Sequence, residues 1–277
     1  MVIYFIIDLL IKNIYLIEEV IIMIANDETV LLIYLSILMF ILGGLFGGFI
    51  DCVSCDMIAS LDDNHERNCF DICVHELGFK SFFNNILKVK CCHCPNKHKI
   101  QHLLVEIITA TLFVLIFLKT RIIDLTFLER IFLVGILIGL SLVDINCYII
   151  PNEYIIVGVI NWLIFSLIRM DWHLMLEGIL SSFTISLSIY LLSIIMKNIT
   201  KEESIGGGDI KLLFLICLYF DLLSSLFIVF LSSIIGIFFI IILKTKKIAF
   251  GPAISLAYLL FYLGGHLIDF KCLFEAL

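Results

Sequence analysis

Long hydrophobic runs recur along the chain at lengths that suit a membrane. A transmembrane helix needs about 20 mostly apolar residues, and residues 29–50 meet this with no charged side chain. After a polar stretch, further apolar runs follow at 103–118, 125–143, 153–169, 174–196, 209–220, 222–243 and 252–270. The 209–220 run is too short to cross alone unless its flanks contribute. The pattern predicts an all-α fold, a polytopic integral membrane helix bundle of about eight spans.

The first hydrophobic segment, residues 2–24, has a different pattern. Asp8, Lys12, Tyr15 and Glu19 recur at helical spacing and form one polar stripe. Such a stripe favours an amphipathic helix at the membrane interface, or one packed against the bundle. A ninth crossing stays open as an alternative.

These patterns predict four parts. Residues 1–28 form the N-terminal amphipathic segment, 29–50 the first span, 51–102 a polar cysteine-rich loop, and 103–277 the main membrane domain. Hydrophobic residues make up 62% of the chain and charged residues 16%, where a soluble domain has about 25% charged residues. That composition excludes an ordinary soluble enzyme. The net charge of -7 argues against nucleic-acid binding.

The orientation follows from the basic residues of the loops. If 29–50 runs inward, the loops on that side include 51–102, 197–208 and 244–251, and these carry most of the Lys and Arg residues. Basic loops stay in the cytoplasm. The loops that follow residues 143 and 196 are therefore predicted to face the cytoplasm.

Two aspartates stand where hydrophobic runs meet these loops. Asp144 ends an apolar run, and Asp209 follows three glycines. Carboxylates at membrane depth are costly and usually functional. Two such groups brought together share a proton, which provides one general base and one general acid. The alternative is that both are solvated residues at helix ends.

Several flanking residues would support such a pair. Gly206 and Gly208 allow unusual backbone dihedrals and a close approach of substrate. Pro151 ends one helix and suits the start of the next. Lys211 could act on an aspartate or extend toward lipid phosphate, and Glu106 opens a span near the same face in a supporting role.

Four segments carry a resemblance to a known family. They are Asp144 with the following Pro151-Asn152, GGGDIKLL at 206–213, AFGPA at 249–253 and LVEIIT at 104–109. In their order along the chain these segments resemble the type IV prepilin peptidase family, the bacterial branch of the GxGD membrane aspartyl proteases. The resemblance implies that Asp144 and Asp209 are the catalytic pair.

The 51–102 loop is rich in cysteine and histidine, the ligands of structural zinc. Many members of the resembled family hold zinc with two CxxC pairs, which implies Cys69, Cys73, Cys91 and Cys94 here, although Cys69 and Cys73 are separated by three residues. Cys92 and the loop histidines compete as ligands, and unmetallated thiols are the other alternative. Cys52 and Cys55 could form a further half-site or simply pack at a helix end.

One departure from the family pattern falls in a segment that the resemblance connects with methylation, the second activity of the bifunctional members of the family. At the end of the first span, Asp51 stands where the family often has Asn, and the usual Arg-x-Pro does not follow. The protease assignment is therefore firmer than the methyltransferase one. No Gly-rich nucleotide-binding fingerprint is present in the sequence, so S-adenosylmethionine is implied by resemblance alone.

The resemblance implies an endopeptidase of the bacterial cytoplasmic membrane. Its substrates would be prepilins or pseudopilins, cleaved after a glycine at the cytoplasmic face and then N-methylated. The alternatives are a protease-only relative of the preflagellin or Tad type, and a non-catalytic zinc-binding assembly or sensor protein. The pattern does not determine the oligomeric state.

Overall fold

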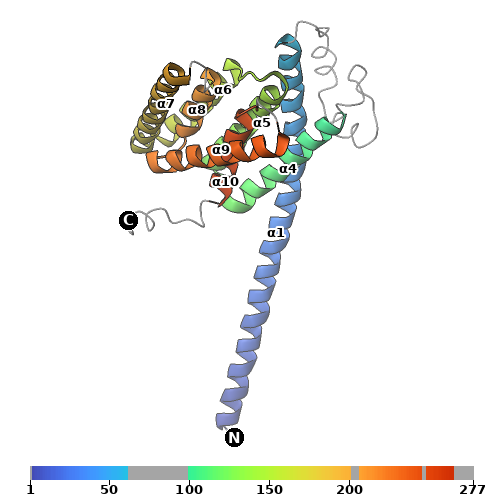
Figure 1. The fold of residues 1–277 in the computed structure, drawn as a ribbon. Coiled ribbons are helices and arrows are strands. Elements are labelled where there is room, and N and C mark those ends of the chain that lie inside the picture. The colour runs from blue at the N-terminus through green and yellow to red at the C-terminus, as the bar shows by residue number, and fades with distance from the viewer. Residues whose placement is uncertain (1, 62–98, 201–205, 245–247, 265–277) are drawn as a thin grey trace.

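The computed structural model describes residues 2–61, 99–200, 206–244 and 248–264, and these residues form eight helices without a strand (Figure 1). The helices are α1 (Val2–Leu61), α4 (Lys99–Thr120), α5 (Leu125–Cys147), α6 (Asn152–Arg169), α7 (Trp172–Thr200), α8 (Gly207–Cys217), α9 (Leu222–Leu243) and α10 (Gly251–Gly264). Six of them, all except α8 and α10, contain a stretch long and apolar enough to cross a membrane. The prediction of an all-α polytopic membrane bundle is confirmed.

Helix α1 is longer than the sequence pattern indicates. It runs unbroken from Val2 to Leu61, so it passes both the predicted boundary at residue 28 and the predicted end of the first span at residue 50. Its N-terminal half extends away from the bundle in Figure 1. The physical reason is the absence of a helix breaker, because the first glycine is Gly43 and the segment contains no proline.

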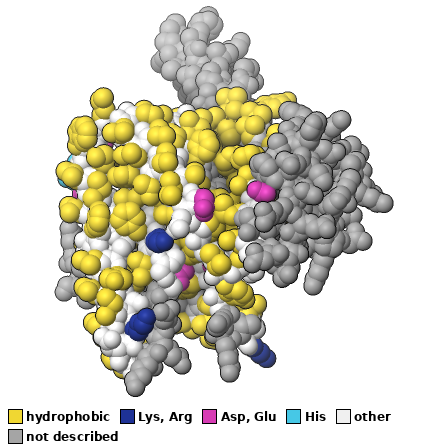
Figure 2. All heavy atoms as spheres, turned by 90° about the horizontal axis from the view of Figure 1, so that it is seen from above, with side chains coloured by type: hydrophobic (Ala, Val, Ile, Leu, Met, Phe, Trp, Pro, Cys, Tyr) yellow, Lys and Arg dark blue, Asp and Glu magenta, His cyan; other side chains and the backbone are white. Residues whose placement is uncertain are grey.

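Helix α5 lies at the centre of the bundle and packs against α1, α4, α6 and α10. Leu133, Val134, Leu140 and Val143 of this helix are fully buried. Outer helices instead turn apolar side chains outward, and on α9 these include Phe230, Ile237 and Ile241. Figure 2 shows a mostly hydrophobic surface from above, with isolated charged side chains among the hydrophobic ones. Such an outer surface suits lipid rather than water.

Small residues allow α1 and α4 to pack closely. A Cβ atom on Gly43 would lie 2.7 Å from Cα of Ala110, and one on Gly47 would lie 2.8 Å from Oγ1 of Thr109. Glycines spaced four residues apart are a common contact surface between membrane helices. Gly43 and Gly47 therefore set how α4 lies along α1.

Replacing Gly43 with leucine should destabilise the bundle. The new side chain has no space against the backbone of α4, and overpacking of this kind costs about 1–3 kcal/mol. We expect a lower unfolding temperature for Gly43→Leu in detergent. Leu42→Phe, at a neighbouring exposed position, is the control and should unfold like the native protein. Equal unfolding temperatures for Gly43→Leu and the native protein would contradict the packing described here.

Candidate active site

Asp144 lies in the last turn of α5, and the chain turns sharply after it. Tyr148 adopts a left-handed conformation with φ 55°, and its N–H donates to the carbonyl oxygen of Asp144 at 2.8 Å. Three residues later, Pro151 begins α6 as its N-cap, with φ -67° and ψ 136°. This turn ends α5 just beyond the carboxylate, at the end of the bundle where α6 starts.

The Asp144 side chain is held by a backbone group of α10. It is buried, with 4% of its surface exposed, and its Oδ2 accepts a hydrogen bond of 2.7 Å from the N–H of Gly251. A Cβ atom at position 251 would lie 2.7 Å from that same oxygen. Gly251 is therefore the residue that lets α10 approach the carboxylate. Sequence reasoning noted it only as part of the AFGPA segment and assigned it no role.

Asp209 lies in the first turn of α8, where a negative charge is favoured by the helix dipole. The prediction that glycines are needed there for unusual dihedrals is wrong. Gly206 has φ -67° and ψ 140°, and no described glycine has a positive φ. The glycines instead provide space, since a Cβ on Gly206 would lie 3.1 Å from Oδ2 of Asp209 and one on Gly208 would lie 2.9 Å from Ile150.

Two further contacts bring the segments around Asp144 and Asp209 together. Gly208 lies against Ile150 of the α5–α6 connection. Lys211 of α8 donates a hydrogen bond of 2.8 Å to Oδ1 of Asn152 at the start of α6. The segments that carry Pro151, Gly206, Gly208 and Lys211 are thus joined. The sequence predicts that Lys211 acts on an aspartate or on lipid phosphate, whereas its hydrogen bond here is to Asn152.

The charge of Asp144 acts on the carboxyl group of Asp209. Burial, and then the negative charge of Asp144, raise the pKa of Asp209 above its ordinary value, and a hydrogen bond with the backbone of Gly206 opposes part of this effect. Asp209 is partly buried, and the preceding Gly206 and Gly207 are exposed. Two coupled carboxyl groups that do not ionise together can act as an acid and a base.

The remaining predicted residues lie elsewhere. Glu106 of α4 is 6% exposed, and its Oε1 lies 3.2 Å from where a Cβ of Gly48 would stand, at the contact between α1 and α4. The four predicted zinc ligands lie outside the described residues, so the zinc prediction stays a prediction. These are Cys69, Cys73, Cys91 and Cys94.

A second buried carboxylate lies at the other end of α5. Glu129 is fully buried and forms an ion pair of 2.9 Å with Arg169 beside a cavity of about 480 Å³. Here the carboxylate faces a guanidinium rather than a second carboxylate. The arrangement therefore joins α5 to α6 through an ion pair.

The fold and this site define a multi-pass membrane protein with two interacting carboxylates at helix ends. Residues 131–241 match the type IV leader peptidase family. The match includes Asp144 and Asp209, and the resemblance seen in the sequence is confirmed.

A curated relative and the solved structures give further comparisons. The chain is 27% identical over 175 residues to a Neisseria gonorrhoeae protein named prepilin leader peptidase/N-methyltransferase. The similarity covers 62% of this chain and 60% of that relative. No solved structure matches the chain significantly.

The contact with Gly251 predicts different stabilities for two substitutions of Asp144. Alanine leaves the buried N–H of Gly251 without an acceptor, which costs about 1–3 kcal/mol. Asparagine keeps an acceptor oxygen and removes a buried charge. We expect Asp144→Asn to unfold at a higher temperature than Asp144→Ala, measured in the same detergent. The reverse order would mean that the Gly251 hydrogen bond does not hold the side chain.

Proposed function

We propose that this chain is a membrane aspartyl endopeptidase that removes the leader peptide of type IV prepilins or pseudopilins. The observation that carries the proposal is the pair of interacting carboxylates, Asp144 and Asp209, at the meeting point of three helix ends. The match of residues 131–241 to the type IV leader peptidase family and the name of the gonococcal relative support the substrate class.

In the proposed mechanism the pair holds one proton. Asp209 is the favoured site for it, because burial and the charge of Asp144 raise its pKa. The ionised carboxylate takes a proton from water as the water oxygen attacks the peptide carbonyl. The protonated carboxyl then gives its proton to the leaving amine as the C–N bond breaks. The products are a free leader carboxylate and a new N-terminal amine.

The surrounding contacts give each carboxylate its position. The N–H of Gly251 orients Asp144, and the contact of Gly208 with Ile150 fixes the start of α8 beside the α5–α6 turn. The hydrogen bond between Lys211 and Asn152 connects the same two segments at the surface. Lys211 thereby acts as a positioning residue for Asp209, two residues earlier.

The pair lies at one end of the bundle, which suits a substrate that is itself held in the membrane. The proposed substrate has a short basic leader ahead of a hydrophobic helix. We place the cleavage after a glycine at the cytoplasmic face, because the basic loops lie on that side. The host membrane is then the bacterial cytoplasmic membrane.

Methylation of the new N-terminus is the second proposed activity. It is favoured by the name of the gonococcal relative, which includes N-methyltransferase. S-adenosylmethionine would supply the methyl group. We assign no described residue to its binding, so this activity carries no mechanism here.

Substitution of either aspartate should abolish processing. Asp144→Asn and Asp209→Asn each remove a carboxyl that must exchange a proton, and we expect cleavage to fall by about 100-fold or more. The measurement is the intact mass of candidate prepilins co-expressed with each variant. A methylated product would add one methyl increment to the mature pilin mass.

Asp221→Asn is the matched control for this experiment. Asp221 is an exposed N-cap of α9, and asparagine caps helices equally well. It should process prepilin like the native protein. Normal cleavage by both Asp144→Asn and Asp209→Asn would overturn the peptidase proposal, whereas cleaved but unmethylated pilin would remove only the transferase.

The raised pKa of Asp209 predicts how cleavage depends on pH. An ordinary Asp carboxyl loses its proton near a pKa of about 3.9, and the pair should keep its shared proton to higher pH. Above the raised pKa both groups are ionised and no acid remains, so kcat/KM should fall as pH rises through it. At low pH both groups are protonated and the base is lost.

The profile should be measured on purified protein with a peptide substrate lacking titratable side chains near the cleaved bond. Unfolding temperatures over the same pH range control for loss of structure. A rate that keeps rising well into the alkaline range would contradict the shared proton.

A further inference from the structure

Four residues spaced four apart share one face of α1: Gly43, Gly47, Asp51 and Cys55. The first two provide the close contact with α4. Cys55 lies one helical turn beyond Asp51, toward the C-terminal end of α1.

The partner residues on α4 run in the opposite direction. Gly43 faces Ala110, Gly47 faces Thr109, and Asp51 contacts His102. The two helices are therefore antiparallel along this face. The glycine contact sets the register that brings the first turns of α4 to the polar part of α1.

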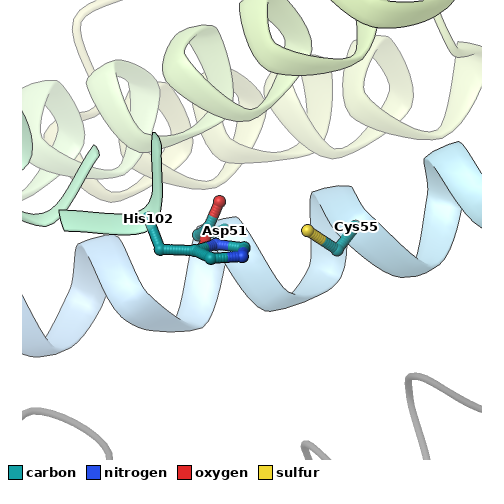
Figure 3. A group of neighbouring side chains, drawn as sticks. All are labelled: Asp51, Cys55 and His102. Carbon is teal, nitrogen blue, oxygen red and sulfur yellow. The ribbon is translucent and has the colours of Figure 1, made fainter. Parts of the chain in front are cut away.

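Asp51, Cys55 and His102 form a compact group of metal-ligating side chains. One ligand atom from each, a carboxylate oxygen, the thiol sulfur and a ring nitrogen, lies within 4.8 Å of the others. Figure 3 shows Asp51 and His102 against each other, with the Cys55 sulfur one turn further along α1. Asp51 is 8% exposed, while Cys55 and His102 are partly buried.

We propose that Asp51, Cys55 and His102 bind a divalent transition-metal ion, with zinc as the best match. Zinc takes oxygen, nitrogen and sulfur ligands in a tetrahedral arrangement. A carboxylate and a thiolate together neutralise its two charges while the imidazole stays neutral. That balance suits a partly buried place between two membrane helices, where an uncompensated charge is costly.

The three ligands leave a fourth position for water or another ligand. Glu106 lies near His102 on the same helix and acts on it electrostatically.

This site is separate from the other chemistry of the chain. The predicted zinc ligands of the loop are four different cysteines, and the carboxylate pair belongs to α5 and α8. The proposal therefore stands or falls independently of the peptidase function.

Metal content of the purified full-length protein tests the site. Zinc per chain would be measured by mass spectrometry of the metal after dialysis against a weak chelator. We expect Cys55→Ala and His102→Ala each to lose one equivalent of zinc per chain relative to the native protein. Cys52→Ala is the matched control, since it removes a neighbouring cysteine of α1 outside the group, and should lose none.

A second measurement separates this ion from any zinc in the loop. With the cysteines at 69, 73, 91 and 94 all replaced by alanine, Co²⁺ should still bind with a thiolate-to-cobalt charge-transfer band. Adding Cys55→Ser should abolish that band. Native metal content in Cys55→Ala overturns the proposal, and so does the absence of cobalt binding in the four-alanine protein while unfolding temperatures show it to be folded.

Discussion

The hydrogen bond from Gly251 to Asp144 is the constraint on which the site depends. A carboxylate at the end of a membrane helix has little access to water and needs another donor. Here the donor is the first N–H of α10, at 2.7 Å. Because a Cβ at that position would meet the same oxygen, the carboxylate and the docking of α10 are fixed together. Ile254, Ala257 and Tyr258 then bury completely as α10 continues into the bundle.

The pair also depends on contacts that each segment makes with the other. Gly208 brings the start of α8 against Ile150, which belongs to the turn after Asp144. Lys211 reaches across to Asn152 from the same helix. Neither carboxylate is positioned by its own helix alone. The two motifs read separately along the sequence therefore form one structural unit, in which the turn after Asp144 supports the helix that carries Asp209.

The sequence alone predicts those features that depend on neighbouring residues along the chain. The length of apolar runs predicts the membrane helices, and the rarity of charge makes Asp144 and Asp209 conspicuous. It did not find the role of Gly251, because that residue lies 107 positions from Asp144 and only the packing of α10 joins them. It gave Gly206 and Gly208 both unusual dihedrals and a close approach of substrate, because a glycine needed for conformation and a glycine needed for space look alike in a sequence. The sequence likewise did not predict the contact of Asp51 with His102, because the two residues are 51 positions apart and only the packing of α1 with α4 brings them together.

The α1–α4 group and the carboxylate pair are joined through described contacts. Ser54, between Asp51 and Cys55 in sequence, shares a hydrogen bond of 2.8 Å with the hydroxyl of Tyr154 on α6. Gly139 of α5 makes room for that hydroxyl, because a Cβ there would lie 2.6 Å from it. Tyr154 is in the first turn of α6, which begins at Asn152, the partner of Lys211. The start of α6 is thus held from both sides, by Ser54 of α1 through Tyr154 and by Lys211 of α8 through Asn152.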